Sequence, residues 1–161
     1  MKFVTNAWYV AAWASDIGPN LKRATILGDN VVLFRKIDGT VAALADRCPH
    51  RMLPLSMGRL VEGDAVRCGY HGLTFNSKGD CIRAPGQDNV PNCQVLAYPV
   101  VEKNDIVWIW MGNPAQANPD EIFTLPEFAD PAWHAHQGDA LHLKSHYLNV
   151  AENLVDPAHV S

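Results

Sequence analysis

The chain has 161 residues, of which 48% are hydrophobic and 19% charged, so it can bury a core and does not have the composition of a disordered protein. Its formal net charge of −4 excludes the basic surface that nucleic acids and anionic membranes attract. The apolar start, residues 1–16, is too short to span a bilayer and carries no convincing signal peptide, so we expect a cytoplasmic protein.

Short apolar runs separated by turn residues follow one another through the first two thirds of the chain. They lie at residues 31–35, 41–45, 65–67, 73–76, 81–83, 95–101 and 106–110. The pair Asp38-Gly39 between the first two runs is typical of a β-hairpin turn. Many short strands at close spacing predict an antiparallel β-sandwich or a partly open barrel. We expect this mainly β domain to occupy residues 1–112.

The remaining residues, 113–161, have a different character. Residues 113–131 are rich in Pro, Asn and acidic side chains and predict a connection, and residues 140–147 alternate loosely and predict a strand. Helical spacing predicts a helix over residues 147–155, and Pro157 predicts a break or a new helix start at Asp156. Histidines at positions 134, 136, 142 and 146 could form a second metal site, but solvent-facing strand positions are the favoured reading.

Two segments combine cysteine with histidine: Cys48-Pro49-His50 and, after seventeen intervening positions, Cys68-Gly69-Tyr70-His71. These four side chains could hold one tetrahedral zinc ion, or a Rieske cluster in which two histidines replace two cysteines on one iron. The second reading is favoured, because each loop supplies one Cys and one His and can serve both irons. Coincidence is the third reading. Cys81 and Cys93 match no ligand position; they could be redox-active, but small residues in or near the core are the favoured reading.

Both loops have a resemblance to a known family. Cys48-Pro49-His50-Arg51 and Cys68-Gly69-Tyr70-His71-Gly72 resemble the cluster loops of Rieske non-haem iron oxygenases. The segments Asn6-Ala7-Trp8-Tyr9-Val10-Ala11 and Pro54-Leu55-Ser56 are similar to oxygenase components of the vanillate O-demethylase and dicamba monooxygenase type. The resemblance implies a [2Fe–2S] cluster with Cys48 and Cys68 on one iron and with His50 and His71 on the other.

Respiratory Rieske proteins carry an additional cysteine in each loop, and the two form a disulfide that braces the cluster. Leu53 and Tyr70 occupy the equivalent positions here, so no such brace can form. Those proteins also place hydroxyl groups near the cluster sulfurs, where this chain has Leu73 and Phe75. Because hydrogen bonds to sulfur raise the potential, we expect one in the lower part of the roughly −150 to +300 mV Rieske window.

A second constellation, Asn153, Asp156 and His159, is similar to the run that opens the mononuclear iron site of these oxygenases. The resemblance implies that His159 is a ligand of a non-haem Fe(II) held by two histidines and a carboxylate. It also implies that Asp156 is the bridging acid, hydrogen-bonded to His71 of a neighbouring subunit and to His159. From this segment alone, the favoured reading is that Asp156 caps a helix that starts at Pro157, with His159 an ordinary surface residue; the Rieske-type motif upstream shifts the preference to the ligand reading.

The printed sequence stops at Ser161, before a second histidine, so we expect residues 113–161 to be a linker and the truncated start of an α+β catalytic domain. The resemblance implies a homotrimeric monooxygenase that uses O2 to hydroxylate or O-demethylate an aromatic substrate, with electrons from a reductase or ferredoxin partner. A ring-hydroxylating dioxygenase of the same family is an alternative. A Rieske ferredoxin-like carrier without catalysis is another, but it would need little beyond residue 112.

Overall fold

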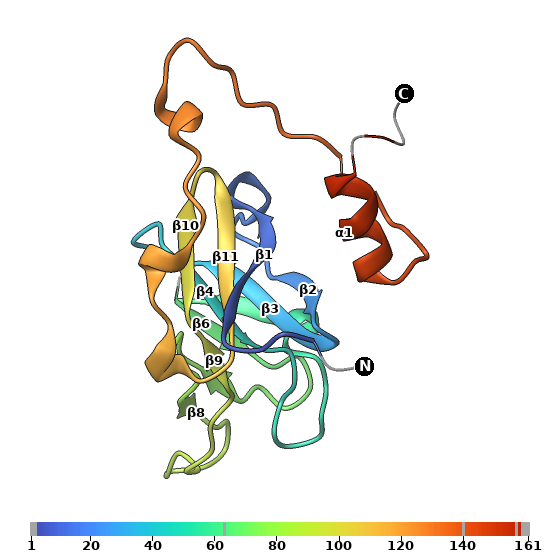
Figure 1. Ribbon diagram of the computed structural model, residues 1–161. Helices are drawn as coiled ribbons and strands as arrows, with labels where there is room; N and C mark the ends of the chain where they lie inside the picture. Colours follow the sequence, from blue (N-terminus) through green and yellow to red (C-terminus); the bar gives the residue numbers. More distant parts are fainter. Residues whose placement is uncertain (1–2, 63, 140, 157, 159–161) are drawn as a thin grey trace.

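The computed structural model describes residues 3–62, 64–139, 141–156 and 158, and shows a β-domain followed by a long segment that leads to one helix (Figure 1). Within these residues, eleven strands form three antiparallel sheets. The prediction of a mainly β, antiparallel fold is confirmed.

The central sheet contains the predicted hairpin and has the order β2-β3-β4-β9. Its strands are β2 (Lys22–Ile26), β3 (Asp29–Arg35), β4 (Val41–Ala45) and β9 (Ala97–Tyr98). Gly39 takes a φ of +86° in the turn between β3 and β4, a conformation that glycine adopts without a steric penalty. The Asp38 carboxylate closes the turn by accepting hydrogen bonds from the Thr40 N–H at 2.8 Å and the Thr40 hydroxyl at 2.7 Å.

The other strands form two further sheets. The first, in the order β1-β11-β10, joins β1 (Ala7–Trp13) to β10 (Val100–Lys103) and β11 (Ile106–Met111), the two ends of the domain. The second, in the order β5-β6-β7-β8, contains β5 (Arg59–Val61), β6 (Ala65–Arg67), β7 (Thr74–Phe75) and β8 (Cys81–Arg83). This second sheet carries the second Cys–His segment in the connection between β6 and β7.

Strand β3 separates two hydrophobic cores. Val32 and Phe34 point into a core that also contains Cys48 and Cys68. Val31 and Leu33 point to the opposite face and pack with residues of β11. Because successive side chains of a strand alternate between faces, a run of four buried residues can serve both cores. The cysteines of the two motifs therefore belong to one of the two packed interiors.

The segment after β11 packs along the β-domain before the chain extends away from that domain. It forms the short 3-10 turns η3 (Pro114–Gln116), η4 (Pro119–Glu121) and η5 (Pro126–Ala129). Ile122 is 2% exposed, and the Lys103 ammonium donates to its carbonyl at 2.8 Å. The Trp8 indole donates to the carbonyl of Asn118 at 2.8 Å. Residues 113–124 are therefore bound to the β-domain, although their composition indicated only a connection.

The one α-helix among the described residues, α1 (Tyr147–Val155), has the predicted bounds and ends before Asp156, where the proline-based break was expected. The Phe3 and Tyr147 rings lie 5.5 Å apart, so the helix touches the N-terminal segment. No helix in the described part of the chain has the length and apolar character that a membrane crossing requires.

The structure differs from the predicted strands in five places. Residues 141–146 form no strand, because their backbone has no neighbouring strand to pair with among the described residues. The predicted run over 95–101 is divided into β9 and β10 at Pro99, which has no N–H to donate to a ladder. Strands β1, β2 and β5 were not predicted, because β1 is apolar throughout and β2 and β5 are short and partly charged.

Candidate metal centre

The two Cys–His segments adopt the same backbone turn. In the first, the Cys48 N–H donates to the Leu53 carbonyl at 2.9 Å, and the Met52 N–H donates back to Cys48 at 2.9 Å. In the second, the Cys68 N–H donates to the Leu73 carbonyl at 2.8 Å, and the Gly72 N–H donates back to Cys68 at 3.2 Å. Each cysteine thus starts a closed loop that bonds to positions four and five residues later.

The fourth residue after each cysteine has a positive φ. Gly72 has a φ of +75°, which costs glycine little, whereas Met52 has a φ of +59°, which is strained for a residue with a Cβ atom. The Met52 side chain is 59% exposed, so no burial accounts for this conformation. The hydrogen bonds at both ends of the loop hold it. This shared turn was not predicted, because methionine gives no sequence signal for a left-handed conformation.

The two motif cysteines meet in the interior. Cys48 is 2% and Cys68 4% exposed, and both belong to the core formed by Val32, Phe34 and their neighbours. Burial raises the pKa of the Cys48 thiol above its ordinary value, and the adjacent Cys68 thiol, which lies within hydrogen-bonding reach, adds to this shift. Two sulfur donors therefore converge at one point below the loop surface.

The two motif histidines meet at the surface instead. The rings of His50 and His71 are exposed, and their centroids lie 4.8 Å apart with planes inclined by 62°. The exposed ring of Tyr70 lies 3.8 Å from that of His71 at 34°, so it covers one face of this imidazole. A hollow of about 310 Å³ opens beside both histidines and is walled partly by residues of the segment 84–93.

Buried polar contacts hold the first loop in place. The Asp46 side chain, which is fully buried, accepts hydrogen bonds from the Ser56 N–H at 2.6 Å and the Ser56 hydroxyl at 2.7 Å. The Arg23 guanidinium lies 3.4 Å from the same carboxylate. Asp46 directly follows β4, and Ser56 lies in the 3-10 turn η2 (Leu55–Met57). The carboxylate therefore ties the start of the first loop to its end.

The donor set fits a two-iron cluster better than one metal ion. Within the residues that the structure describes, no three His, Cys, Asp or Glu side chains converge on a position that could hold a single ion. The sulfurs of Cys48 and Cys68 form one pair, and the rings of His50 and His71 form another. A Rieske cluster needs this division, since one of its irons takes two thiolates and the other takes two imidazoles.

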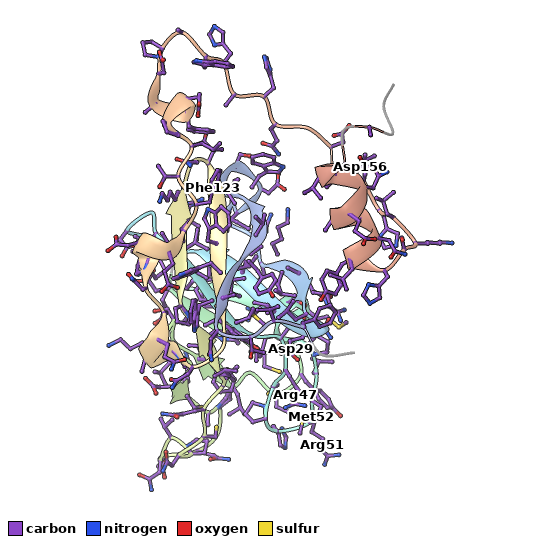
Figure 2. All side chains as sticks on the ribbon, in the orientation of Figure 1. Asp29, Arg47, Arg51, Met52, Phe123 and Asp156 are labelled. Carbon is purple, nitrogen blue, oxygen red and sulfur yellow. The ribbon has the colours of Figure 1, made fainter. Side chains whose placement is uncertain are left out.

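The second predicted constellation is only partly described. His159 and Pro157 lie outside the described residues. The Asp156 N–H donates to Glu152 at 3.1 Å, and its carboxylate accepts the Ala158 N–H at 3.0 Å, a contact typical of a capping residue. Figure 2 labels Asp156 near the top of the view, and Arg51 and Met52 of the first loop near the bottom. The structure therefore does not bring Asp156 to the histidine pair of its own chain.

The other residues considered from the sequence have simpler environments. His134, His136 and His142 are exposed, and His146 caps α1 by accepting the Leu148 N–H at 3.2 Å. They lie on irregular backbone and not on the predicted strand. All four cysteines of the chain are free thiols, and Cys81 and Cys93 lie side by side at the edge of the core.

Comparison with known proteins places the motif in a family. The Rieske [2Fe-2S] domain pattern matches residues 7–94. The chain is 46% identical over 162 residues to the iron-sulfur subunit of the toluene-4-sulfonate monooxygenase system of Comamonas testosteroni, covering 99% of this chain and 46% of that protein. It is 43% identical over 164 residues to the oxygenase component of dicamba O-demethylase of Stenotrophomonas maltophilia, covering 99% of this chain and 47% of that protein.

Solved structures agree with these sequence matches. The crystal structure of dicamba monooxygenase bound to dicamba superposes with a TM-score of 0.78 at 44% identity, covering 82% of this chain and 40% of that one. A terminal oxygenase of carbazole 1,9a-dioxygenase from Nocardioides aromaticivorans superposes with a TM-score of 0.61 at 30% identity, covering 68% and 31%. The chain spans less than half the length of the relatives that it matches.

Proposed function

This chain belongs to the Rieske [2Fe-2S] domain family, and from that membership we propose that Cys48 and Cys68 hold one iron of its cluster and His50 and His71 the other. The observation that carries the proposal is the separation of the four donors into a buried thiol pair and an exposed imidazole pair on two matching loops. Such a cluster stores and passes on one electron at a time.

We further propose that residues 1–112 are the cluster domain of an oxygenase component, and that residues 113–161 begin its catalytic domain. The named relatives support this proposal, since they are oxygenase or iron-sulfur components of monooxygenase systems. His159 then belongs to a non-haem Fe(II) site that acts with O2 to hydroxylate or O-demethylate an aromatic compound. A reductase or ferredoxin supplies the electrons, and the enzyme is a cytoplasmic homotrimer.

Different residues of this chain serve different parts of the proposed electron path. The apolar core around Cys48 and Cys68 excludes water from the sulfur side of the site. His50 and His71 present their rings to the surface, where an electron donor or acceptor can approach them. Asp156 accepts a hydrogen bond from His71 of a neighbouring subunit and so orients that imidazole. Its carboxylate also stabilises the positive charge of the imidazole when the ring is protonated.

The surroundings of the site support a low potential. Leu73 and Phe75 place no hydroxyl near the motif sulfurs, and the hydroxyl between them, that of Thr74, donates to the Gly72 carbonyl at 3.1 Å. With no added hydroxyl donors to the cluster sulfurs, we expect a potential in the lower part of the roughly −150 to +300 mV window. Such a potential suits electron delivery to an oxygen-activating iron.

The first experiment is reconstitution of this chain with iron and sulfide. We expect two irons and two sulfides per chain, visible absorption, and an EPR signal after reduction. A colourless, zinc-loaded protein contradicts the cluster assignment. In the longer gene product supplied with a reductase, His159→Ala should abolish substrate turnover while the visible spectrum persists. Undiminished turnover would support the carrier alternative and remove the iron-ligand role of His159.

A further inference from the structure

Cys81 and Cys93 face each other across a short antiparallel pairing. Asp80 and Gln94 form an isolated bridge next to them, flanked by hydrogen bonds from the Cys81 N–H to the Cys93 carbonyl at 3.1 Å and from the Val95 N–H to the Gly79 carbonyl at 2.8 Å. This register places the two cysteines directly opposite each other. Opposed residues have Cα atoms about 4.5–5.5 Å apart. That range falls within the roughly 4.4–6.8 Å that a disulfide spans.

The side chains meet as the backbone register requires. The Cys93 thiol lies within hydrogen-bonding reach of the Cys81 thiol, whose sulfur also contacts the Arg83 carbonyl at 3.7 Å. Both cysteines are half-buried and pack against the core that contains Cys48. Burial raises the pKa of the Cys81 thiol to about 11, so Cys81 is present as a thiol at neutral pH. No other cysteine is needed to complete the pair.

The chain between these cysteines forms one wall of the site. Ala84, Pro85, Gln87, Pro91 and Cys93 line the hollow beside the histidine pair. Pro85 also packs against the second motif loop: a Cβ added at Gly72 would lie 2.9 Å from the Pro85 ring. A covalent link between residues 81 and 93 would therefore close a ring around the segment that flanks His71.

We propose that Cys81 and Cys93 are a reversible dithiol–disulfide site that reacts with low-molecular-weight disulfides such as glutathione disulfide. The sulfur of Cys93, a residue that lines the hollow, attacks one sulfur of the reagent as a thiolate. The reagent's S–S bond breaks, and one reduced thiol leaves with the proton. The Cys81 sulfur then attacks Cys93, releasing the second reduced thiol. The protein loses two electrons and two protons, and the reagent gains them.

The disulfide restricts the conformations of the segment between the two cysteines and leaves the fold of the domain unchanged. It closes a thirteen-residue ring and removes conformations from residues 82–92 without adding a contact elsewhere. The wall beside His50 and His71 thereby becomes more rigid, and the site registers the thiol–disulfide balance of its surroundings. This inference rests on the cysteine geometry and holds whether or not the chain belongs to an oxygenase.

The test uses the cluster-loaded chain, equilibrated anaerobically with reduced and oxidised glutathione in graded ratios. Free thiols are then alkylated, and peptides are mapped by mass spectrometry. We expect a Cys81–Cys93 disulfide with the mass loss of two hydrogen atoms, reversed by reduced glutathione, while the visible absorption of the cluster persists. Hydrogen exchange of residues 82–92 should slow about tenfold in the oxidised form. A disulfide joining other cysteines, or complete alkylation of both residues at every ratio, overturns the proposal.

Two serine variants test the order of attack without depending on activity. Cys81→Ser should accumulate a glutathione adduct on Cys93, because the second step is missing. Cys93→Ser should accumulate none on Cys81, and neither variant should form the internal disulfide. Circular dichroism and the cluster spectrum show whether each variant is folded. An adduct only in Cys93→Ser, or an adduct in neither variant, contradicts the proposed site.

Discussion

Cys48 and Cys68 are buried, whereas His50 and His71 are exposed, and this difference determines what each residue pair can do. Thiols in an apolar core are shielded from water and from competing reagents. Imidazoles at the surface can be reached by a partner protein. At the scale of single residues, the chain therefore combines a protected side and an accessible side in one site.

The imidazole pair can be tested by replacing one donor. In His50→Cys, a thiolate takes the place of a neutral imidazole, which adds negative charge to the cluster. We expect the potential to fall from the Rieske window towards about −400 mV, the region of four-cysteine clusters. Protein film voltammetry measures the shift. His142→Cys, at an exposed position away from both loops, should leave the potential unchanged, and an unshifted His50→Cys would remove His50 from the ligand set.

At the scale of elements, the two loops depend on a close approach between η2 and β6. A Cβ atom added at Gly58 would overlap the carbonyl oxygen of Arg67 and would lie 2.9 Å from that of Leu55. Both obstacles are backbone atoms, which cannot move aside without shifting a loop. Gly58 is therefore a position where the sheet and the first loop are packed against each other.

We expect Gly58→Ala to lower the free energy of unfolding by about 1–3 kcal/mol, as overpacking usually does. Urea denaturation followed by circular dichroism measures this change, and cluster content after reconstitution should fall in parallel. Gly18→Ala is the matched control, because a Cβ there would meet no atom within 4 Å. Equal stabilities for the two variants would show that the close approach relaxes without cost.

The stability of the hairpin turn between β3 and β4 depends on pH through the Asp38 carboxylate. Hydrogen bonds from Thr40, assisted by Lys36, lower the pKa of Asp38 from 3.8 to about 2. The turn is stabilised above pH 3.8, where the carboxylate is charged in folded and unfolded chains, and this contribution is lost as the pH falls towards 2. Thr40→Val should move the pKa of Asp38 up towards 3.8.

An NMR titration of the Asp38 carboxyl carbon measures that shift. Thr25→Val is a suitable control, since the Thr25 hydroxyl donates to the Asn30 side chain, which carries no charge. A lowered pKa that persists in Thr40→Val would assign the effect to the backbone N–H of residue 40 and to Lys36 instead of the hydroxyl.

At the scale of the whole molecule, Asp156 and the histidine pair belong to different regions of the chain. If the acid serves His71 of a neighbouring subunit, Asp156→Asn in the longer gene product should slow reoxidation of the cluster about 10- to 100-fold, with both metal centres still loaded. Stopped-flow absorbance after mixing with O2 and substrate measures the rate. Glu152→Gln, an exposed position on the same helix, is the control. Unchanged reoxidation would remove the bridging role.

Local patterns predicted much of this architecture. The hairpin around Asp38-Gly39 and the bounds of α1 followed from turn residues and periodicity, because these signals lie within a few residues of the structure they specify. The motif spacing identified the four candidate ligands. Strand β1 was missed, because its apolar residues serve an interface with β11, almost a hundred residues later, and show no alternation.

Long-range contacts account for what else could not be predicted. The anchoring of the first loop by Asp46 and Ser56 depends on the way in which β4 and η2 meet. The juxtaposition of Cys81 and Cys93 depends on a register that only one isolated bridge records. Neither relation has a sequence signature, since both arise when separate segments pack together.

The attachment of residues 113–124 to the β-domain determines how far from that domain the following residues can carry Asp156. Because Lys103 and Trp8 bind this segment, the chain leaves the domain well beyond residue 112. The seventeen residues from 130 to 146 lie between η5 and α1, and fully extended they span at most about 60 Å. That length is about twice the roughly 30 Å diameter of a small domain. Once the hydrogen bond from the Ser15 hydroxyl to the Gln137 side chain, 2.9 Å, is released, the segment is long enough to present Asp156 to another copy of the chain.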